Sequence, residues 1–386
     1  MIQMKIEKKE CMGCGACTAA CPKNCIELVP DGEGFRYPAV NAHNCVECHL
    51  CESVCPVLMK PPIHGIPAAL AAKNLDTYIR SASSSGGVFT ALAEAVIAEG
   101  GAVCAAKYDA NFSVVHDFAR SVYDLAAFRG AKYAQSKPEH CFSEIKRLLR
   151  DGATVLFVGT PCQVAGLSAY LGKPDANLIL VDMICHGVPS PKVWQHYLDE
   201  RKEIDAPRSV LKSVNMRHKG SGWSRYKYSV EMTYADGYRY CVPQGQDWFM
   251  RGFTENLYLR PSCENCHFKG LRRCSDLTLG DFWGIWDLSP AFDDNRGISL
   301  LLIHSQRGSI IWNEVCGQFD IQQFSADDAV MANPSARNSS TPHPKRAEFF
   351  SGLEDADVIN LIQHVLTEPE PRCSLVRRIM NRFRKK

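Results

Sequence analysis

Two copies of one cysteine pattern lie near the start of the chain, and they constrain its fold more than any other feature. Each copy has the spacing C-x2-C-x2-C-x3-C-P; the first runs from Cys11 to Pro22 and the second from Cys45 to Pro56. Three cysteines spaced in this way can wrap tightly around three corners of a small inorganic cube. The fourth follows on a short helix, and the proline ends the pattern. Eight thiolates in this register predict a compact metal-binding module.

The same pattern holds cubane iron–sulfur clusters in bacterial-type ferredoxins with two clusters, where the fourth cysteine of each copy serves the other cluster. Zinc would explain the C-x2-C pairs but neither the third spacing nor the proline, and disulfides would require an oxidising compartment. We therefore predict two 4Fe–4S clusters and a module that carries single electrons. The predicted ligands are Cys11, Cys14, Cys17 and Cys55 for one cluster, and Cys45, Cys48, Cys51 and Cys21 for the other.

Composition places the chain among ordinary globular proteins of the cytoplasm. Its 386 residues allow two or three domains, with 46% hydrophobic and 22% charged residues. The net charge of +2 gives no indication of a nucleic-acid partner. The first residues lack the apolar run of a secretory signal, and no stretch reaches the ~20 apolar residues of a membrane span. Nineteen cysteines, eight of them already assigned to clusters, predict a reducing compartment.

The pattern of apolar residues divides the chain into segments. Residues 1–60 form the predicted ferredoxin-type domain, with a hairpin over 25–40, and the proline-rich residues 61–67 form a stiff linker. Beyond the linker, helices and strands alternate. The continuous apolar runs at 154–158 and 178–181 are typical of buried parallel strands. Further predicted elements are helices at 86–100, 121–129, 140–151, 308–316, 344–353 and 357–366, strands at 101–108, 112–119 and 298–303, and hairpin-like strands within 209–242.

The end of the chain is predicted to be a helical and basic tail, over 341–386. Within it, residues 374–386 place Leu375, Ile379 and Phe383 on one helical face, with arginines elsewhere. Such a pattern is typical of a helix that lies on a membrane surface, and a solvated terminus is the alternative. Peripheral membrane contact through this tail is therefore one predicted interaction.

A second set of cysteines lies in predicted loops outside the ferredoxin-type domain. Cys162 and Cys185 each come just after the carboxyl end of a predicted strand, where open α/β sheets bind their ligands. Cys263 and Cys266 form a C-x2-C pair, and Cys274 follows eight residues later. Together they predict a four-thiolate site for either a third iron–sulfur cluster or a structural zinc. The spacing leaves both metals open, and the electron-carrying module favours iron–sulfur. The other cysteines are interpreted as core residues: Cys25, Cys104, Cys141, Cys241, Cys316 and Cys373.

The segment from Arg80 to Gly87, Arg-Ser-Ala-Ser-Ser-Ser-Gly-Gly, directly precedes a predicted helix. Small residues allow close approach of a ligand, and the N-terminus of a helix favours an anion, to which Arg80 would add charge. A diphosphate of a flavin or nicotinamide nucleotide would fit here, although a plain capped loop has the same composition. The segment is neither a Walker loop nor the G-x-G-x-x-G fingerprint.

Five motifs in the order found here resemble the beta-subunit family of coenzyme F420-dependent hydrogenases and dehydrogenases. The motifs are Arg80-x3-Ser84-Ser85-Gly86-Gly87-Val88-Phe89, Lys132-Tyr133-x-Gln135-Ser136, Gly159-Thr160-Pro161-Cys162-Gln163, Cys185-His186-Gly187-Val188-Pro189-Ser190, and Ser262-Cys263-x2-Cys266 followed by Ser275-Asp276-Leu-Thr-Leu-Gly280-Asp281-Phe282-Trp283-Gly284. The resemblance covers about 68–340, and bacterial members commonly carry an N-terminal two-cluster ferredoxin module.

The resemblance implies an iron–sulfur flavoprotein with FAD and a third 4Fe–4S cluster in its main domain. The expected fold is a ferredoxin-like module (α+β) followed by a mixed α/β flavin and iron–sulfur domain, of which 68–150 is the N-terminal part and 151–340 carries the third cluster. The implied ligands of that cluster are Cys162, Cys185, Cys263 and Cys266, with Cys274 an alternate ligand or a bystander. The implied flavin-binding residues are Arg80, Ser84, Ser85, Gly86, Gly87, Lys132, Tyr133, Gln135, Ser136, Gly159 and Thr160.

These features together predict an oxidoreductase that converts between two-electron and one-electron transfer, with FAD on one side and clusters on the other. A redox protein or a small electron carrier would be its partner. The alternatives are an electron-transfer subunit without its own substrate, supporting an enzyme that acts for example in surface-polysaccharide synthesis, and a zinc protein of structural role. No catalytic residue is predicted. His186 fits either a proton shuttle or a structural role, and Asp281 and Trp283 fit either a flavin pocket or a turn and the core.

Overall fold

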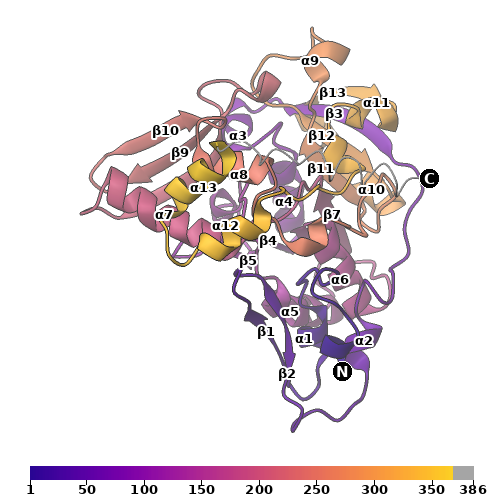
Figure 1. The fold of residues 1–386 in the computed structure, drawn as a ribbon. Helices are drawn as coiled ribbons and strands as arrows, with labels where there is room; N and C mark the ends of the chain where they lie inside the picture. Colours follow the sequence, from indigo (N-terminus) through magenta and orange to yellow (C-terminus); the bar gives the residue numbers. More distant parts are fainter. Residues whose placement is uncertain (368–386) are drawn as a thin grey trace, which may run out of the picture.

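The computed structural model describes residues 1–367, and its centre is an eight-stranded mixed sheet with strand order β13-β3-β12-β11-β7-β6-β4-β5 (Figure 1). The four strands β11, β7, β6 and β4 run parallel to their neighbours within this group, and the outer pairs are antiparallel. The strands are β3 (Ala68–Asn74), β4 (Ala102–Tyr108), β5 (Val114–Ala119), β6 (Val155–Gly159), β7 (Leu178–Met183), β11 (Leu277–Asp281), β12 (Ser299–Ile303) and β13 (Phe319–Phe324).

Helices cover both faces of the sheet. Its central strands are therefore buried on both sides, and their sequences are continuous apolar runs. All five residues of β6 are buried. Helices α4 (Val88–Ala98) and α10 (Gln306–Val315) pack on one face, through side chains such as Leu92 and Trp312. On the other face, Phe142 of α5 (Glu139–Arg150) and Val164 of α6 (Pro161–Leu171) pack together. Smaller helices nearby are α3 (Thr77–Ala82), α9 (Ile285–Leu288) and α11 (Ala326–Val330).

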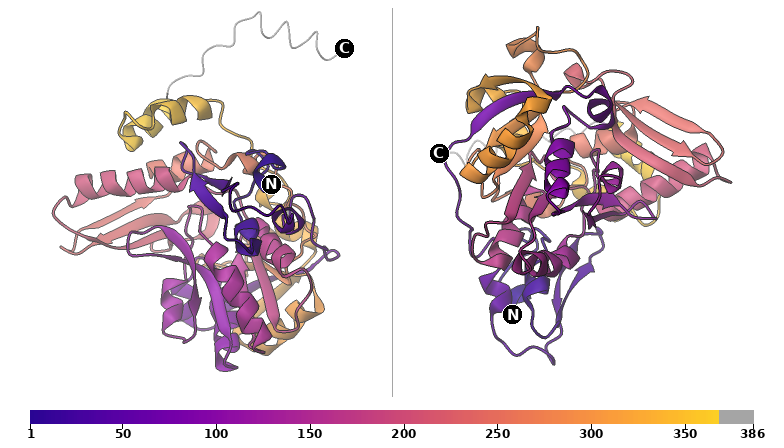
Figure 2. Two further views of the ribbon diagram at one scale, coloured as in Figure 1. Left: turned by 90° about the horizontal axis from the view of Figure 1, so that it is seen from below. Right: turned by 180° about the vertical axis from the view of Figure 1, so that it is seen from behind.

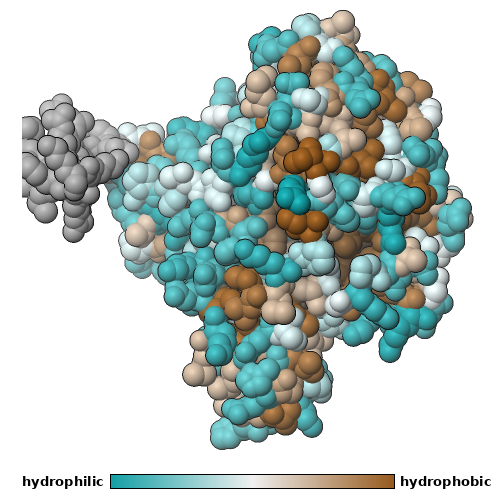
Figure 3. Space-filling view, turned by 90° about the vertical axis from the view of Figure 1, so that its right-hand side faces the viewer, coloured by the Kyte–Doolittle hydropathy of each residue, from teal (hydrophilic) through white to brown (hydrophobic). Residues whose placement is uncertain are grey.

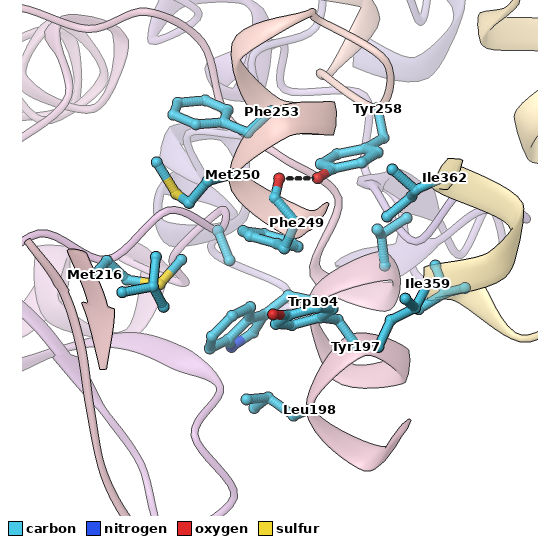
Figure 4. Close-up of a cluster of buried hydrophobic side chains, with 14 of the residues drawn as sticks. Trp194, Tyr197, Leu198, Met216, Phe249, Met250, Phe253, Tyr258, Ile359 and Ile362 are labelled. Atoms are coloured by element: carbon cyan, nitrogen blue, oxygen red, sulfur yellow. Dashed lines mark hydrogen bonds between the residues drawn. The ribbon is translucent and has the colours of Figure 1, made fainter. Parts of the chain in front are cut away.

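A second layer is built on a three-stranded antiparallel sheet with the order β10-β9-β8. Figure 4 shows its hydrophobic core, in which Trp194 and Tyr197 of one helix lie against Phe249 of another and Ile359 and Ile362 close the cluster. Figure 2 shows this sheet projecting from the body. Its elements are β8 (Leu211–His218), β9 (Ser229–Tyr234), β10 (Arg239–Pro243), α7 (Pro191–Asp205), α8 (Trp248–Thr254), α12 (Arg346–Gly352) and α13 (Val358–Thr367).

The N-terminal segment forms a separate lobe below the body, visible in Figures 1 and 3. Its buried Ala16, at the start of α1, packs against α5 and α6, and Arg36 on β2 forms an ion pair with Glu139 of α5. The lobe is therefore docked on the large sheet by both apolar and charged contacts. Its elements are α1 (Ala16–Ala20), α2 (Leu50–Ser53) and the hairpin strands β1 (Ile26–Pro30) and β2 (Arg36–Val40).

Most predicted elements are present, with shifts at their ends. The hairpin over 25–40 and the parallel strands near 154–158 and 178–181 are confirmed. The predicted strand at 112–119 begins only at Val114, because Phe112 has φ +56° in the preceding turn. The predicted helix at 121–129 is wrong: only a short 3-10 turn forms over Asp124–Ala127. The predicted parts 68–150 and 151–340 both contribute strands to the same sheet.

The second half of the predicted tail lies outside the described residues. The helices expected at 344–353 and 357–366 are present as α12 and α13, whereas the basic stretch with the proposed membrane-facing side, and Cys373 within it, falls in 368–386. Across residues 1–367, no helix combines the length and the apolar character that a membrane crossing requires.

Candidate metal and cofactor sites

The eight cysteines of the tandem pattern gather in the N-terminal lobe around two small cavities. One cavity, named site A here, is lined by Cys11, Cys14, Cys17 and Cys55. The other, site B, is lined by Cys21, Cys45, Cys48 and Cys51. In each site, three cysteines come from one copy of the pattern and the fourth from the other. The structure thus brings together the two sets that the spacing predicts.

Cys25 is a fifth cysteine at site B. Its Sγ lies 3.3 Å from the Sγ of Cys21, and its backbone N–H donates to the same sulfur at 3.4 Å. The side chain is buried and lines the cavity together with Cys45. Cys25 was predicted to be a small buried side chain, and it is buried. The spacing of the cysteines did not indicate that it lies so close to Cys21.

A third cavity, site C, is lined by the four cysteines of the second set: Cys162, Cys185, Cys263 and Cys266. Cys162 lies in the first turn of α6, where Thr160 is the N-cap and Gln163 completes a capping box. Cys185 follows β7, and Cys263 ends a 3-10 turn over Pro261–Cys263. The cavity is thus formed where strand ends meet a distant loop.

Cys274 does not line site C. Its side chain is partly buried and packs against the hydrophobic cluster that contains Phe142 and Val164. Cys274 therefore lies outside the four-cysteine group of site C.

The thiols of site C would need a bound metal to become thiolates. Burial and the neighbouring thiols raise the pKa of Cys162, Cys185 and Cys263 to about 12 each, against a usual 9.0. Metal ligation requires thiolates, which such an environment disfavours unless a positive centre lies among them. Four convergent sulfurs in a buried cavity therefore fit a thiolate-ligated metal or cluster, and a tetrathiolate set suits either zinc or iron–sulfur.

A larger cavity of about 500 Å³ lies next to site C, at the carboxyl ends of the parallel strands. This volume is in the range of small-molecule and cofactor sites. The segment from Cys185 to Val188 lines both this cavity and site C. Met12, between two cysteines of the N-terminal lobe, lines both site C and site A. The large cavity, site C and site A therefore follow one another with shared walls.

Several buried polar atoms at the large cavity have no partner within the described part of the chain. Arg217 donates from Nη1 to Asp281 at 2.7 Å, but its Nε and Nη2 and the Oδ1 of Asp281 are unpaired. His116 is stacked on Phe157, and its Nε2 is 3.0 Å from the Val158 carbonyl. Because a carbonyl only accepts, Nε2 carries the proton, and the unpaired Nδ1 is an acceptor.

Burial lowers the pKa of His116 to about 4, so the ring is neutral at neutral pH. Buried polar groups are nearly always hydrogen-bonded, so unpaired donors and acceptors at one cavity indicate a polar ligand. Aromatic rings complete the wall: Tyr228 and Trp283 lie over the Arg217 guanidinium, at 3.9 and 4.9 Å from ring centre to Cζ. Polar groups and aromatic faces together fit a cofactor such as a flavin nucleotide.

The flavin-binding residues implied by the resemblance separate into two groups. Eight of them line the large cavity: Ser84, Ser85, Gly87, Lys132, Tyr133, Ser136, Gly159 and Thr160. Lys132 donates to the carbonyls of Phe128, Arg129 and Gly130, and burial lowers the pKa of its amine to about 7. The Ser-Gly-Gly turn and the strand-end loop thus meet at one cavity although they are far apart in the chain.

The other three implied residues do not line the cavity. Arg80 is buried, forms an ion pair with Asp294 and donates from Nε to the Gly297 carbonyl at 2.8 Å. Gly86 packs against strands, and an added Cβ would overlap the Ala72 carbonyl oxygen. Gln135 turns toward the N-terminal lobe, where its amide bonds Met12 and Arg260. These three residues support the walls of the cavity or its junction with the lobe.

His186 lies on the segment shared by the large cavity and site C. Its Nε2 is 2.6 Å from Asn256 Oδ1 and its Nδ1 is 3.2 Å from Ser335 Oγ. Burial lowers its pKa below the usual 6.5. The sequence left two roles open for His186, a proton shuttle and a structural role. A neutral ring with both nitrogens hydrogen-bonded fits the structural role. Asp281 and Trp283, also left open, both line the large cavity.

Three residues of these sites carried no recognisable signal in the sequence. His116 is one histidine within the alternating pattern of β5, Arg217 is near the end of β8, and Arg260 precedes the C-x2-C pair. Only the pairing of strands and the docking of the lobe bring them to the cavities.

Comparison with known proteins places these features in a family. Residues 152–327 match the family that describes the C-terminal part of the coenzyme F420 hydrogenase/dehydrogenase beta subunit, and residues 69–139 match the corresponding N-terminal family. Residues 10–59 match a 4Fe-4S dicluster domain. Both matches to the beta subunit fall within residues 68–340, the range over which the sequence resembles this family.

Two individual proteins are similar to parts of this chain. An uncharacterized ferredoxin of Methanocaldococcus jannaschii is 31% identical over 55 residues, which are 14% of this chain and 70% of that protein. A chain in the xenon-derivatised F420-reducing NiFe hydrogenase complex from Methanosarcina barkeri aligns with a TM-score of 0.47 at 18% identity, over 73% of this chain and 97% of that one. The protein belongs to the coenzyme F420 hydrogenase/dehydrogenase beta-subunit family, and a 4Fe–4S dicluster domain precedes the two segments typical of that family.

Proposed function

We propose that this protein is an FAD- and 4Fe–4S-dependent oxidoreductase that moves electrons between a two-electron carrier and one-electron centres. FAD would occupy the large cavity, and clusters would occupy sites A, B and C. When bound, a flavin accepts two electrons together and can release them one at a time, while cubane clusters carry single electrons. The observation that carries the proposal is the sharing of walls: Cys185 to Val188 between the large cavity and site C, and Met12 between sites C and A.

The residues of the chain would position and insulate these groups. Ser84, Gly87 and Thr160 border the large cavity at the ends of strands and turns, where a nucleotide is commonly held. Arg217 and His116 line the same cavity, and their buried donors and acceptor without a partner in residues 1–367 would bond the ligand. The half-buried cysteines of site C would lie between the flavin and the lobe. We propose the order flavin, site C, then sites A and B, then an external redox partner, with flow in either direction.

Iron–sulfur is proposed for site C in preference to zinc because of its position. A structural zinc has no reason to share one wall with a cofactor-sized cavity and another with a cluster site, whereas an electron carrier needs both neighbours. The domain boundaries at 1–60 and 68–340 fit this division, with the lobe as the exit for single electrons. The partner would be a redox protein or a small electron carrier.

Anaerobic purification followed by flavin, iron and sulfide assays tests the proposal. We expect one FAD and about twelve irons per chain, four for each of three cubane clusters. Cys266→Ser should remove about one third of the iron while Cys274→Ser, outside site C, keeps all of it. Zinc in place of the lost third, or no flavin at all, would contradict the proposal.

A second assay distinguishes an enzyme from a subunit without its own substrate. The purified protein is mixed with reduced nicotinamide or deazaflavin nucleotide, and bleaching of its iron–sulfur absorbance is followed. Bleaching without another polypeptide is expected for the oxidoreductase. A requirement for a second protein would instead identify it as an electron-transfer subunit.

A further inference from the structure

Arg260 lies fully buried at the junction of the N-terminal lobe and the body. Its guanidinium donates from Nε to the carbonyl of Cys11 at 2.8 Å, from Nη1 to Oε1 of Gln135 at 2.8 Å, and from Nη2 to the carbonyl of Arg36 at 3.0 Å. Two of these acceptors belong to the lobe and one to the body. The side chain is thus held in a fixed position by three hydrogen bonds.

All three acceptors are neutral, and no carboxylate of residues 1–367 forms an ion pair with Arg260. Two other arginines at the same junction differ in this respect, since Arg36 pairs with Glu139 and Arg346 pairs with Glu33. The rings of Tyr37 and Phe35, at 4.3 and 5.6 Å, provide only a weak balance. A buried charge is costly unless an opposite charge balances it, so Arg260 requires a negative group nearby.

The two groups nearest to Arg260 are sites A and C. The guanidinium bonds the backbone of Cys11, a lining residue of site A, and a Cβ placed on Gly13 in the same loop would meet its Nη1 at 2.9 Å. Arg260 also lines site C, together with Cys162 and Cys263. The charge therefore lies between two sets of four thiols, whereas its three acceptors within the described chain include no residue that lines site B.

We propose that Arg260 is the shared counter-charge of the clusters at sites A and C and that it raises the reduction potentials of both. This inference depends on the proposed function, because it needs clusters at these two sites. A cube held by four thiolates has a net negative charge, which increases by one when the cluster accepts an electron. A fixed cation between two such clusters stabilises their reduced forms more than their oxidised forms. Electrons would therefore be retained on this pair rather than on site B.

Reduction potentials of the purified protein, measured by a redox titration followed by electron paramagnetic resonance, test this role. Arg260→Gln removes the charge and keeps a hydrogen-bonding side chain. We expect the equilibrium constants for reduction of two clusters to fall at least tenfold. For a one-electron couple this corresponds to a fall of about 59 mV in reduction potential. The third cluster, at site B, should change less. Arg260→Lys keeps the charge, so its potentials should stay near those of the wild type even if it melts at a lower temperature.

Gln135→Glu tests the same charge without removing Arg260. The Oε1 of Gln135 already accepts from Arg260, so a carboxylate at this position would neutralise the guanidinium with almost no change in shape. The variant also loses the hydrogen bond that the Gln135 amide nitrogen donates to the Met12 carbonyl. It should lower the same two potentials. This variant decides the question if Arg260→Gln loses its clusters on purification.

The control is the double variant Arg36→Gln with Glu139→Gln, which removes an ion pair from the same junction without changing the net charge. It should lower the melting temperature and leave all three potentials in place. Unchanged potentials in Arg260→Gln or in Gln135→Glu, at full iron content, would overturn the proposal, as would an equal fall in Arg260→Lys. A wild-type protein without a cluster at site C would instead refute the proposed function.

Discussion

The side-chain amide nitrogen of Gln135 donates a 3.0 Å hydrogen bond to the backbone carbonyl of Met12. Met12 is in the loop that carries Cys11 and Cys14, and it lines both site A and site C. Two residues before Gln135, Tyr133 lines the large cavity. One short segment therefore contacts the proposed flavin site with one side chain and the cluster loop with another. The relative position of the two sites depends on how firmly the lobe is docked.

Docking leaves no room for a side chain at Gly15. This residue has φ +82°, and a Cβ there would overlap the Cβ of Glu139 on α5. Gly15→Ala should therefore push the lobe away from α5 or prevent docking, with a loss of about 1–3 kcal/mol as for other overpacked sites. Thermal melting and the rate of proteolysis in the linker 61–67 measure the effect. Gly152→Ala is the matched control, because Gly152 has φ +83° and nothing lies within 4 Å of an added Cβ. It has the same backbone cost, so it should lower the melting temperature less than Gly15→Ala and leave proteolysis of the linker unchanged.

The ion pair between Arg36 and Glu139 makes the docking sensitive to acid. Burial raises the pKa of Glu139, but the hydrogen bonds and charge of Arg36 outweigh this, and the pKa ends below the usual 4.5. Because the pKa of Glu139 is lower in the folded protein than in the unfolded chain, its ionised carboxylate stabilises the fold above about pH 4.5. This stabilisation is lost as the pH falls from 4.5 through the pKa of Glu139 in the folded protein. Breaking such a pair from one side costs about 3 kcal/mol.

Glu139→Gln tests this pH dependence. At pH 7 the variant should melt well below the wild type, and the difference between the two should shrink as the pH is lowered past 4.5, because the wild-type carboxyl then becomes protonated. Melting temperatures of both proteins at a series of pH values measure it. A difference that stays constant down to pH 3 would show that the charge of Glu139 has no part in docking.

The sequence predicted those parts of the sites that depend on local spacing. The exchange of Cys21 and Cys55 between sites A and B follows from one repeated pattern. Cys162 and Cys185 could be predicted to lie at one site because both follow parallel strands, and the carboxyl ends of parallel strands lie at the same edge of the sheet. The central strands were recognised because a strand buried on both faces must be apolar throughout.

Partners far apart in the chain were beyond such reasoning. Arg80, expected at an anion site beside the Ser-Gly-Gly turn, instead pairs with Asp294, more than 200 residues later. Strand β3 was not predicted, because its many alanines give no clear alternation of apolar and polar side chains. In the sheet it lies between β13 and β12. The roles of Arg217 and His116 depend on which strands become neighbours, which no local pattern fixes.

His116 provides the sharpest test of the large cavity. The residue lines the cavity, its Nε2 is bound to the Val158 carbonyl, and its buried Nδ1 has no partner among residues 1–367. We expect this Nδ1 to accept a hydrogen bond from the bound ligand. His116→Phe keeps a ring stacked on Phe157 but removes both nitrogens. Losing one buried hydrogen bond to the cofactor costs about 1–3 kcal/mol, so the Kd for FAD should rise about tenfold or more.

Fluorescence titration of the flavin-depleted protein with FAD measures this affinity, and the iron content shows whether the clusters remain. His140→Asn is the control, because the His140 side chain is exposed on α5 and lies no closer than 3.9 Å to the carboxylate of Glu139. It should bind FAD as the wild type does. If His116→Phe also bound FAD with unchanged affinity, the unpaired Nδ1 would have no role in holding a cofactor, and the cavity would have to bind its ligand through Arg217 and the aromatic wall alone.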